Sequence, residues 1–435
     1  MLTLFRLLCY NYTCKKKKGE KMTKKQQNLL IFMCWALYVS AYLGRYSYTA
    51  NIVPIISAFG KTKTETGLIS SMFFFAYGAG QIINGLLCKY YNTKYMLFGS
   101  LIVSSIINVA IFLGVPFVAY KYLWLVNGLA QSILWSSLIM TLSKNLDEHH
   151  IKKAILVMST TTSVGIFLSY GLSALLVMFN VYQIIFLIVT VVMSVSAVFW
   201  VLLYNKMTLR ETPSEEEHFE VKVKQQKQKT DKSVYKILVI FGLFAVVVNL
   251  IKDGLSTWIP NVLKEIYGLQ DSLSIFLTLF VPVLGIFASA MVVAMNKKIK
   301  DHNALMAILF AMATVLSLVV VLMLKTSAWV VVLIAFAGLV FLMSASNNVI
   351  TSILPFWLRD KANSGFVAGI LNGCCYVGST ISSVGLGSIA ENFGWSIVFD
   401  IFLILTAVVV LYACIILIVK KIREKRNKTI QDKIK

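Results

Sequence analysis

Twelve mostly apolar stretches of roughly 20 residues or more, enough for a helix to cross a bilayer, dominate this 435-residue sequence. We expect spans at approximately 27–57, 65–88, 95–114, 119–143, 153–178, 182–204, 235–262, 270–294, 303–324, 328–354, 363–391 and 395–420. Hydrophobic residues make up 58% of the chain and charged residues only 14%, with a mean hydropathy of +0.77. Soluble domains are less apolar and more charged. The sequence therefore predicts an all-α membrane protein with twelve transmembrane helices and argues against a soluble enzyme.

A polar segment divides the spans into two groups of six. We assign a tail at 1–26, an N-terminal six-helix half at 27–204, a central loop at 205–234, a C-terminal six-helix half at 235–420 and a tail at 421–435. The opening of the chain contains no signal-peptide cleavage pattern. Met22 would be a natural start, which leaves open that residues 1–21 are an upstream extension.

The distribution of basic residues predicts how the protein sits in the membrane. The formal net charge is +22, and lysine and arginine gather in the two tails and in the central loop. Such clusters mark cytoplasmic segments, and an even number of spans puts both termini on the same side. We therefore expect a multi-pass cell-membrane protein with cytoplasmic termini. Surplus charge for anionic lipid headgroups is compatible with this pattern, whereas nucleic-acid binding is not expected.

The segment "AYLGRYSYTANIVPI", residues 41–55, contains an intramembrane cation, Arg45. A charged side chain at mid-membrane costs from ~2.5 to over ~10 kcal/mol, so a functional role is the default interpretation. Lys252 lies at a similar depth in the first span of the second half, and proline follows each cation at a similar distance. Matched cations in two repeated halves are typical of a transporter whose site lies between them. Snorkelling to a span end is the alternative for each cation.

The neighbours of the two cations indicate the ligand. Tyr38, Tyr42, Arg45 and Thr49 share one helix face, which we expect to line a polar cavity. The spans of the first half contain no acidic residue well inside them, so a bound anion is the expected partner of Arg45. Arginine suits phosphate because its fork donates two parallel hydrogen bonds.

Two carboxylates keep a proton-coupled symporter open as an alternative, Asp253 and Asp400. Asp253 directly follows Lys252. Because adjacent residues on a helix do not face each other, we expect it to be a poor ion-pair partner for this lysine within the span. A bridge from Asp253 to another helix is the alternative.

Other polar or small residues in the spans favour structural roles. Tyr77 and Gln81 share a face, as do Asn127 and Gln131, and such pairs most often hydrogen-bond helices to each other. Gly365, Gly369 and Gly373 recur at every fourth position, which predicts close helix packing. No residue pattern indicates a catalytic site, a metal or another cofactor.

Five segments together resemble a known family, the organophosphate:phosphate antiporters of the major facilitator superfamily, which include glycerol-3-phosphate and hexose-6-phosphate transporters. The segments are "YLGRYSYTANIVP", "AYGAGQIINGLL", "NGLAQSILW", "KDGLSTWIPNVLKE", and "NGCCYVGS" with "ENFGW". The resemblance covers nearly all of residues 27–420. It implies that Arg45 and Lys252, one from each half, bind phosphate. It also implies that a set of tyrosines lines the pocket: Tyr38, Tyr42, Tyr77 and Tyr376.

Several positions depart from the pattern of this family. Gln81 replaces a lysine, Thr162 replaces a histidine and Asn249 replaces a pocket tyrosine. Thr257 replaces an acid, and Lys89 stands where the superfamily usually has aspartate. We include Gln81, Thr162 and Asn249 among the expected substrate-binding residues.

The resemblance and the cation pair together predict a secondary transporter. It would exchange a sugar phosphate or glycerol phosphate for inorganic phosphate by alternating access, as a monomer in the lipid bilayer and without a cofactor. Two alternatives remain: a sugar-phosphate sensor with a transporter fold, and a proton- or sodium-coupled organic anion symporter.

Overall fold

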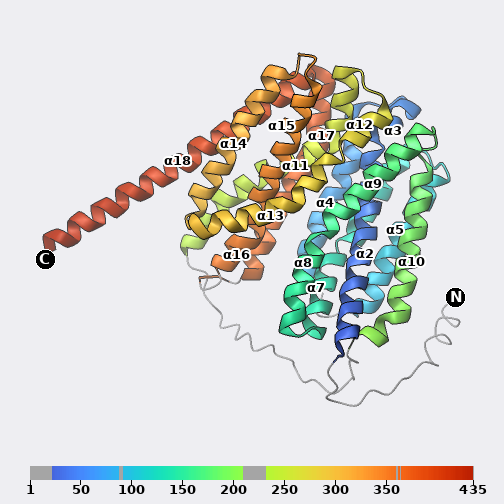
Figure 1. Ribbon diagram of the computed structural model, residues 1–435, viewed down its shortest axis with the longest axis horizontal. Coiled ribbons are helices and arrows are strands. Elements are labelled where there is room, and N and C mark those ends of the chain that lie inside the picture. Colours follow the sequence, from blue (N-terminus) through green and yellow to red (C-terminus); the bar gives the residue numbers. More distant parts are fainter. Residues whose placement is uncertain (1–21, 88–91, 209–231, 359–360, 363, 435) are drawn as a thin grey trace.

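The computed structural model describes residues 22–87, 92–208, 232–358, 361–362 and 364–434 (Figure 1). The proposed extension at 1–21, most of the central loop and Lys89 lie outside this part of the chain.

The N-terminal half is a bundle of helices around an aromatic core that contains Trp124, Phe186 and Trp200. Its first helix begins after Thr23, whose side chain forms a capping box with Gln26. The helices of this half are α2 (Lys24–Ala50), α3 (Ile52–Phe59), α4 (Lys63–Leu87), α5 (Thr93–Phe112), α6 (Phe117–Gln131), α7 (Leu134–Asn145), α8 (Glu148–Ser159), α9 (Thr161–Met178) and α10 (Ile184–Met207).

The C-terminal half has its own core, which contains Phe244, Trp258, Phe310 and Phe399. Its helices are α11 (Lys232–Tyr267), α12 (Asp271–Leu277), α13 (Phe280–Lys298), α14 (His302–Met323), α15 (Trp329–Asn348), the π-helical turn η2 (Val349–Ile353), α16 (Leu354–Trp357), α17 (Ser364–Phe393) and α18 (Trp395–Ile434). In Figure 1 the two halves stand side by side, and α18 extends away from the bundle.

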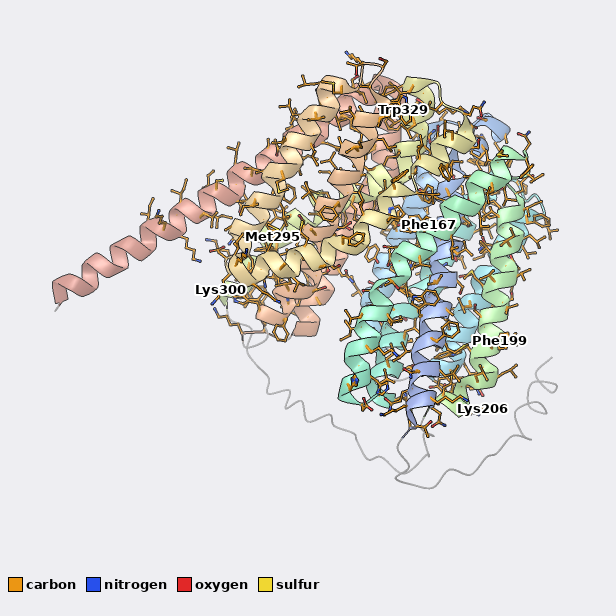
Figure 2. All side chains as sticks on the ribbon, in the orientation of Figure 1. Phe167, Phe199, Lys206, Met295, Lys300 and Trp329 are labelled. Atoms are coloured by element: carbon orange, nitrogen blue, oxygen red, sulfur yellow. The ribbon has the colours of Figure 1, made fainter. Side chains whose placement is uncertain are left out.

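The predicted all-α architecture is confirmed. Among the described residues, twelve helical segments are long and apolar enough to cross a membrane, and they correspond one to one to the predicted spans. Their ends agree to about five residues, except that the first segment ends at Ala50 and not at 57, because the helix breaks at Asn51 before α3. Four of these segments are interrupted: Phe117–Asn145, His149–Met178, Asp271–Lys298 and Trp329–Trp357. The outer surface is rich in exposed apolar side chains, such as Phe167 and Phe199 (Figure 2), as expected for helices that face lipid.

The described hydrogen bonds and ion pairs of charged side chains between the halves lie toward one end of the bundle, which we call the α3 end (loops 60–62, 268–270 and 324–328). Neutral contacts between α4 and α17 continue along most of α4, as far as Gln81 and Asn372. There Lys63 Nζ lies 3.0 Å from Glu265 Oε2, and the amide of Thr64 donates to Glu391 at 3.0 Å. Lys264 Nζ donates to Ser57 Oγ at 3.2 Å. Toward the opposite end, called the α8 end because α8 begins there, the ribbons of the two halves diverge (Figure 1).

Close packing of α4 against α17 depends on glycines other than the predicted ones. A Cβ at Gly78 would lie 2.6 Å from Tyr376 Cβ, and one at Gly67 would overlap the Ser383 carbonyl. Gly369, in contrast, is exposed, with open space where a Cβ would stand. The prediction of close packing is therefore wrong at Gly369, whereas Gly373 faces α4, where a Cβ would lie at an ordinary contact distance of 3.6 Å from Ile82. The spacing in α17 did not reveal that the closest approaches of the two helices lie at Gly67 and Gly78 of α4.

The orientation of the bundle in the membrane is directly testable. A reporter inserted near Gln226, or fused after Lys435, is expected to report the cytoplasm because lysines and arginines cluster in these segments. A matched insertion at Asn180, in the loop between α9 and α10 at the α3 end, should report the opposite side. A protease-accessibility or alkaline phosphatase assay makes the measurement. An external signal near Gln226 or after Lys435 would contradict the orientation.

Candidate functional site

A polar cavity of about 210 Å³ lies between the halves. The N-terminal half contributes α2, α8 and α9 to its walls, and the C-terminal half contributes α11, α13 and α15. Most of the lining side chains are polar or charged: Tyr46, Ser159, Thr162, Ser163, Tyr170, Lys252, Asp253, Ser256, Thr278, Ser344, Asn347 and Asn348.

Interrupted helices build this cavity. Ser159 and Thr162 flank the break between α8 and α9 at Thr160, and Thr278 lies in the break between α12 and α13. Asn347 and Asn348 immediately precede the π-helical turn η2. Irregular backbone at membrane depth is tolerated where it lines a cavity, and π-helical turns are frequent at functional sites. The backbone therefore supports this location for a binding site.

Lys252 lines the cavity, but not as an isolated cation. Its Nζ lies 3.4 Å from Asp253 Oδ1, and the two side chains are only 22% and 10% exposed. The other carboxylate oxygen, Asp253 Oδ2, accepts a short hydrogen bond from Ser379 of α17. The expectation that Asp253 would be a poor partner for Lys252 is therefore wrong. The Cα–Cβ vectors of adjacent residues do diverge, but the flexible four-carbon stem of lysine allows its ammonium group to reach the neighbouring carboxylate.

Arg45 is buried, with 5% of its surface exposed, among aromatic rings of α2 and α4. Its guanidinium carbon lies 4.1 Å from the ring centre of Tyr77, 4.6 Å from that of Tyr42 and 5.2 Å from that of Phe73. Nε donates to Gln131 Oε1 at 3.4 Å. Within the described part of the chain, Nη2 has no hydrogen-bond partner. A buried donor without a partner is unfavourable, so this side of the fork is suited to an incoming acceptor.

Tyrosines and amides connect Arg45 to the C-terminal half. The Tyr38 and Tyr77 hydroxyls lie 3.5 Å apart, and Gln81 Nε2 donates to the Tyr77 hydroxyl at 3.1 Å. Asn372 of α17 donates to Gln81 Oε1 at 3.1 Å, and the rings of Tyr77 and Tyr376 lie 4.9 Å apart. The predicted shared face of Tyr77 and Gln81 thus forms part of the contact between the halves.

The nine predicted site residues therefore fall into two adjoining groups. Lys252 and Thr162 line the cavity, and Asn249 donates to the lining residue Asn347 at 3.1 Å. The remaining six gather in the aromatic cluster around Arg45: Tyr38, Tyr42, Arg45, Tyr77, Gln81 and Tyr376.

The residue of α2 that lines this cavity is Tyr46, rather than the predicted face of Tyr38, Tyr42, Arg45 and Thr49. Arg45 and Thr49 are buried in helix packing. The Tyr46 ring stacks on Tyr42 with centres 6.3 Å apart, which links the cavity to the aromatic cluster. The polar pattern does not determine the rotation of α2, which depends on its packing against α9 and α10.

Sequence reasoning did not select Tyr46, Ser344 or Ser379 as site residues. Tyr46 could have been found because it continues the i, i+4 series of Tyr38 and Tyr42. Serines are common in membrane helices, so Ser344 and Ser379 carry no distinguishing signal without the packing of α15 and α17.

Two groups of six membrane-spanning helices with a polar, cation-containing cavity between them are the arrangement typical of secondary transporters. The chain belongs to the Major Facilitator Superfamily, whose family model matches residues 34–383. It is thus a multi-pass membrane protein of a transporter family and not an enzyme.

Several curated proteins are similar to this chain. The glycerol-3-phosphate transporter of Bacillus subtilis is 24% identical over 411 residues, which cover 88% of this chain and 89% of that protein. The membrane sensor protein UhpC of Escherichia coli is 25% identical over 108 residues, and a probable hexose phosphate transport protein of Chlamydia pneumoniae is 22% identical over 125 residues. The last two matches span only 24% and 28% of the length of those relatives. The predicted resemblance to organophosphate transporters is confirmed by these similarities.

Solved structures support the fold. A bacterial homologue of the human lysosomal transporter Spinster, in an inward-facing and occupied conformation, superposes with a TM-score of 0.70 and 15% identity. The match covers 90% of this chain and 98% of that protein.

Proposed function

We propose that the protein exchanges a phosphorylated small metabolite, of the sugar phosphate or glycerol phosphate class, for inorganic phosphate. The observation that carries this proposal is a pair of cations, one from each half. Arg45 Nη2 is buried without a hydrogen-bond partner among the described residues, and the rings of Tyr42 and Tyr46 connect Arg45 to the polar cavity that Lys252 lines. The named activities of the similar transporters from Bacillus subtilis and Chlamydia pneumoniae support the same substrate class.

Each group of the site has a role in this proposal. Arg45 donates hydrogen bonds from its fork to the phosphate oxygens, and the rings of Tyr42 and Tyr77 hold the guanidinium in place. Lys252 supplies a mobile point charge from the other half. The hydroxyls and amides of the cavity, such as Thr162 and Asn347, hydrogen-bond the organic part of the substrate.

Substrate binding would couple to alternating access because the two cations belong to different halves. A bound phosphate dianion attracts both, so it draws the halves together around the site. We propose that this structure is the state open toward the α8 end. Two observations support this: the described hydrogen bonds and ion pairs of charged side chains between the halves lie at the α3 end, and the ribbons of the halves diverge toward the α8 end (Figure 1).

Counterflow in proteoliposomes tests the proposal. Vesicles containing the purified chain are loaded with inorganic phosphate, and uptake of labelled phosphate is measured after dilution. Externally added glycerol 3-phosphate or a hexose 6-phosphate is expected to compete with this uptake and to release the internal phosphate. Vesicles loaded with sulfate serve as the control. Absence of phosphate exchange would refute the proposed antiport.

A sensor is the second candidate, favoured by the similarity to the sensor protein UhpC of Escherichia coli. A sensor would bind the sugar phosphate without exchanging it. Thermal protection by a hexose 6-phosphate combined with no counterflow would therefore favour this role over transport.

A further inference from the structure

We infer that the preferred substrate is a phosphate monoester that also carries an ammonium group, with its phosphate on Arg45 and Lys252 and its ammonium group on Asp253. This inference rests on the proposed function and specifies the substrate of the same site. It follows from the charge balance of the cavity and from the position of the Asp253 carboxylate within it.

The two cations of the site bind a phosphate dianion, but Asp253 leaves part of its charge uncompensated. Among the described residues that line the cavity, the charged pair is Lys252 and Asp253. Arg45 adds a further positive charge, which the rings of Tyr42 and Tyr46 connect to the cavity. The three groups together therefore carry a charge of +1. A phosphate monoester carries about −1.5 to −2 at pH 7, which leaves an uncompensated negative charge in the membrane. An ammonium group on the ligand lowers its net charge to about −1 and balances the site.

The geometry of Asp253 suits a second cation. Its Oδ1 faces Lys252 Nζ at 3.4 Å, which is longer than the ~2.7–2.9 Å of a strong charge-assisted hydrogen bond. Its Oδ2 accepts a hydrogen bond from Ser379, a residue of α17 that does not line the cavity. A carboxylate has about four acceptor positions, so these two contacts leave room for a ligand ammonium group.

Lys252 can exchange one partner for another. In the structure its charge is balanced by Asp253, which lines the same cavity. When the substrate enters, the phosphate attracts Lys252 and the ligand ammonium group takes its place at Asp253. Each charge then keeps a partner, so no isolated buried ion is created. A substrate without an amine would instead leave Asp253 without a cation once Lys252 moves to the phosphate.

The alternative is that the Lys252–Asp253–Ser379 chain only ties α11 to α17. Matched ligands separate the two ideas. Glucosamine 6-phosphate, glucose 6-phosphate and N-acetylglucosamine 6-phosphate differ at a single substituent, and only the first carries an ammonium group. Competition of each against labelled inorganic phosphate is measured with the full chain in proteoliposomes. We expect glucosamine 6-phosphate to bind about tenfold more tightly than the other two.

Asp253→Asn is expected to abolish this preference because the amide cannot pair with an ammonium ion. Asp271→Asn serves as the matched control: it removes a carboxylate that pairs with Lys264 and does not line the cavity, so the preference should persist. A preference of the Asp253→Asn variant equal to that of the wild type would overturn the inference. If that variant does not fold, the ratio measured on the wild-type chain still decides.

The experiment also distinguishes the inference from the function on which it rests. Equal competition by the three sugar phosphates against phosphate would refute the ammonium preference and leave the antiport intact. Absence of labelled phosphate exchange would refute both.

Discussion

Replacing Arg45 by alanine is expected to weaken the binding of inorganic phosphate about ten- to hundredfold. Hydrogen bonds to a charged group contribute roughly 1.5–3 kcal/mol, and this change removes the guanidinium nitrogen that has no partner in the described part of the chain. Arg45→Lys keeps the positive charge but removes the planar guanidinium group that can donate two parallel hydrogen bonds. Its affinity for phosphate should therefore lie between those of the wild type and Arg45→Ala. Binding is measured by titration calorimetry or by the phosphate concentration that half-saturates counterflow.

The control for this series is Lys121→Ala. Lys121 lies on α6 about 15 Å along the helix from Gln131, the partner of Arg45, so phosphate binding should not change. A competing explanation is that Arg45 only holds α2, α4 and α6 together through its aromatic contacts. In that case phosphate would protect Arg45→Ala against heat as strongly as it protects the wild type, and Arg45 would not be a phosphate ligand.

The fold could be predicted in detail because a bilayer leaves few options. An apolar run of roughly 20 residues must satisfy its backbone hydrogen bonds internally, so each run specifies a helix and its approximate ends. The positions of Arg45 within α2 and of Lys252 within α11 followed from counting residues from the start of each apolar run. These features depend on local sequence, which explains why they agree with the structure.

The arrangement of the site could not be predicted to the same degree. Whether α2 presents Arg45 or Tyr46 to the cavity depends on the packing of α2 against α9 and α10, and several rotations satisfy the same polar pattern. The contact between Lys252 and Asp253 depends on the rotamer of a long side chain. Ser379 lies far from both in sequence and approaches Asp253 only because α17 packs against α11.

Lys252→Ala is expected to lower both the stability of the protein and its affinity for phosphate. Removing one partner of a buried ion pair is unfavourable by about 3–5 kcal/mol, because the remaining charge is left without compensation. Lys252 is 22% exposed, so we expect a smaller loss, roughly 1–3 kcal/mol. Lys252→Arg should retain both properties, since arginine preserves the charge and adds a fork suited to phosphate.

The double variant Lys252→Ala, Asp253→Asn separates stability from binding. Without the carboxylate no uncompensated charge remains at this position, so thermal stability should return close to that of the wild type. Affinity for phosphate should stay low, because the second cation of the site is still absent. Thermal unfolding in detergent, with and without inorganic phosphate, measures both quantities on the same sample. If the double variant recovers wild-type phosphate affinity, Lys252 is not a phosphate ligand. If Lys252→Ala alone is as stable as the wild type, its contact with Asp253 contributes nothing to the fold.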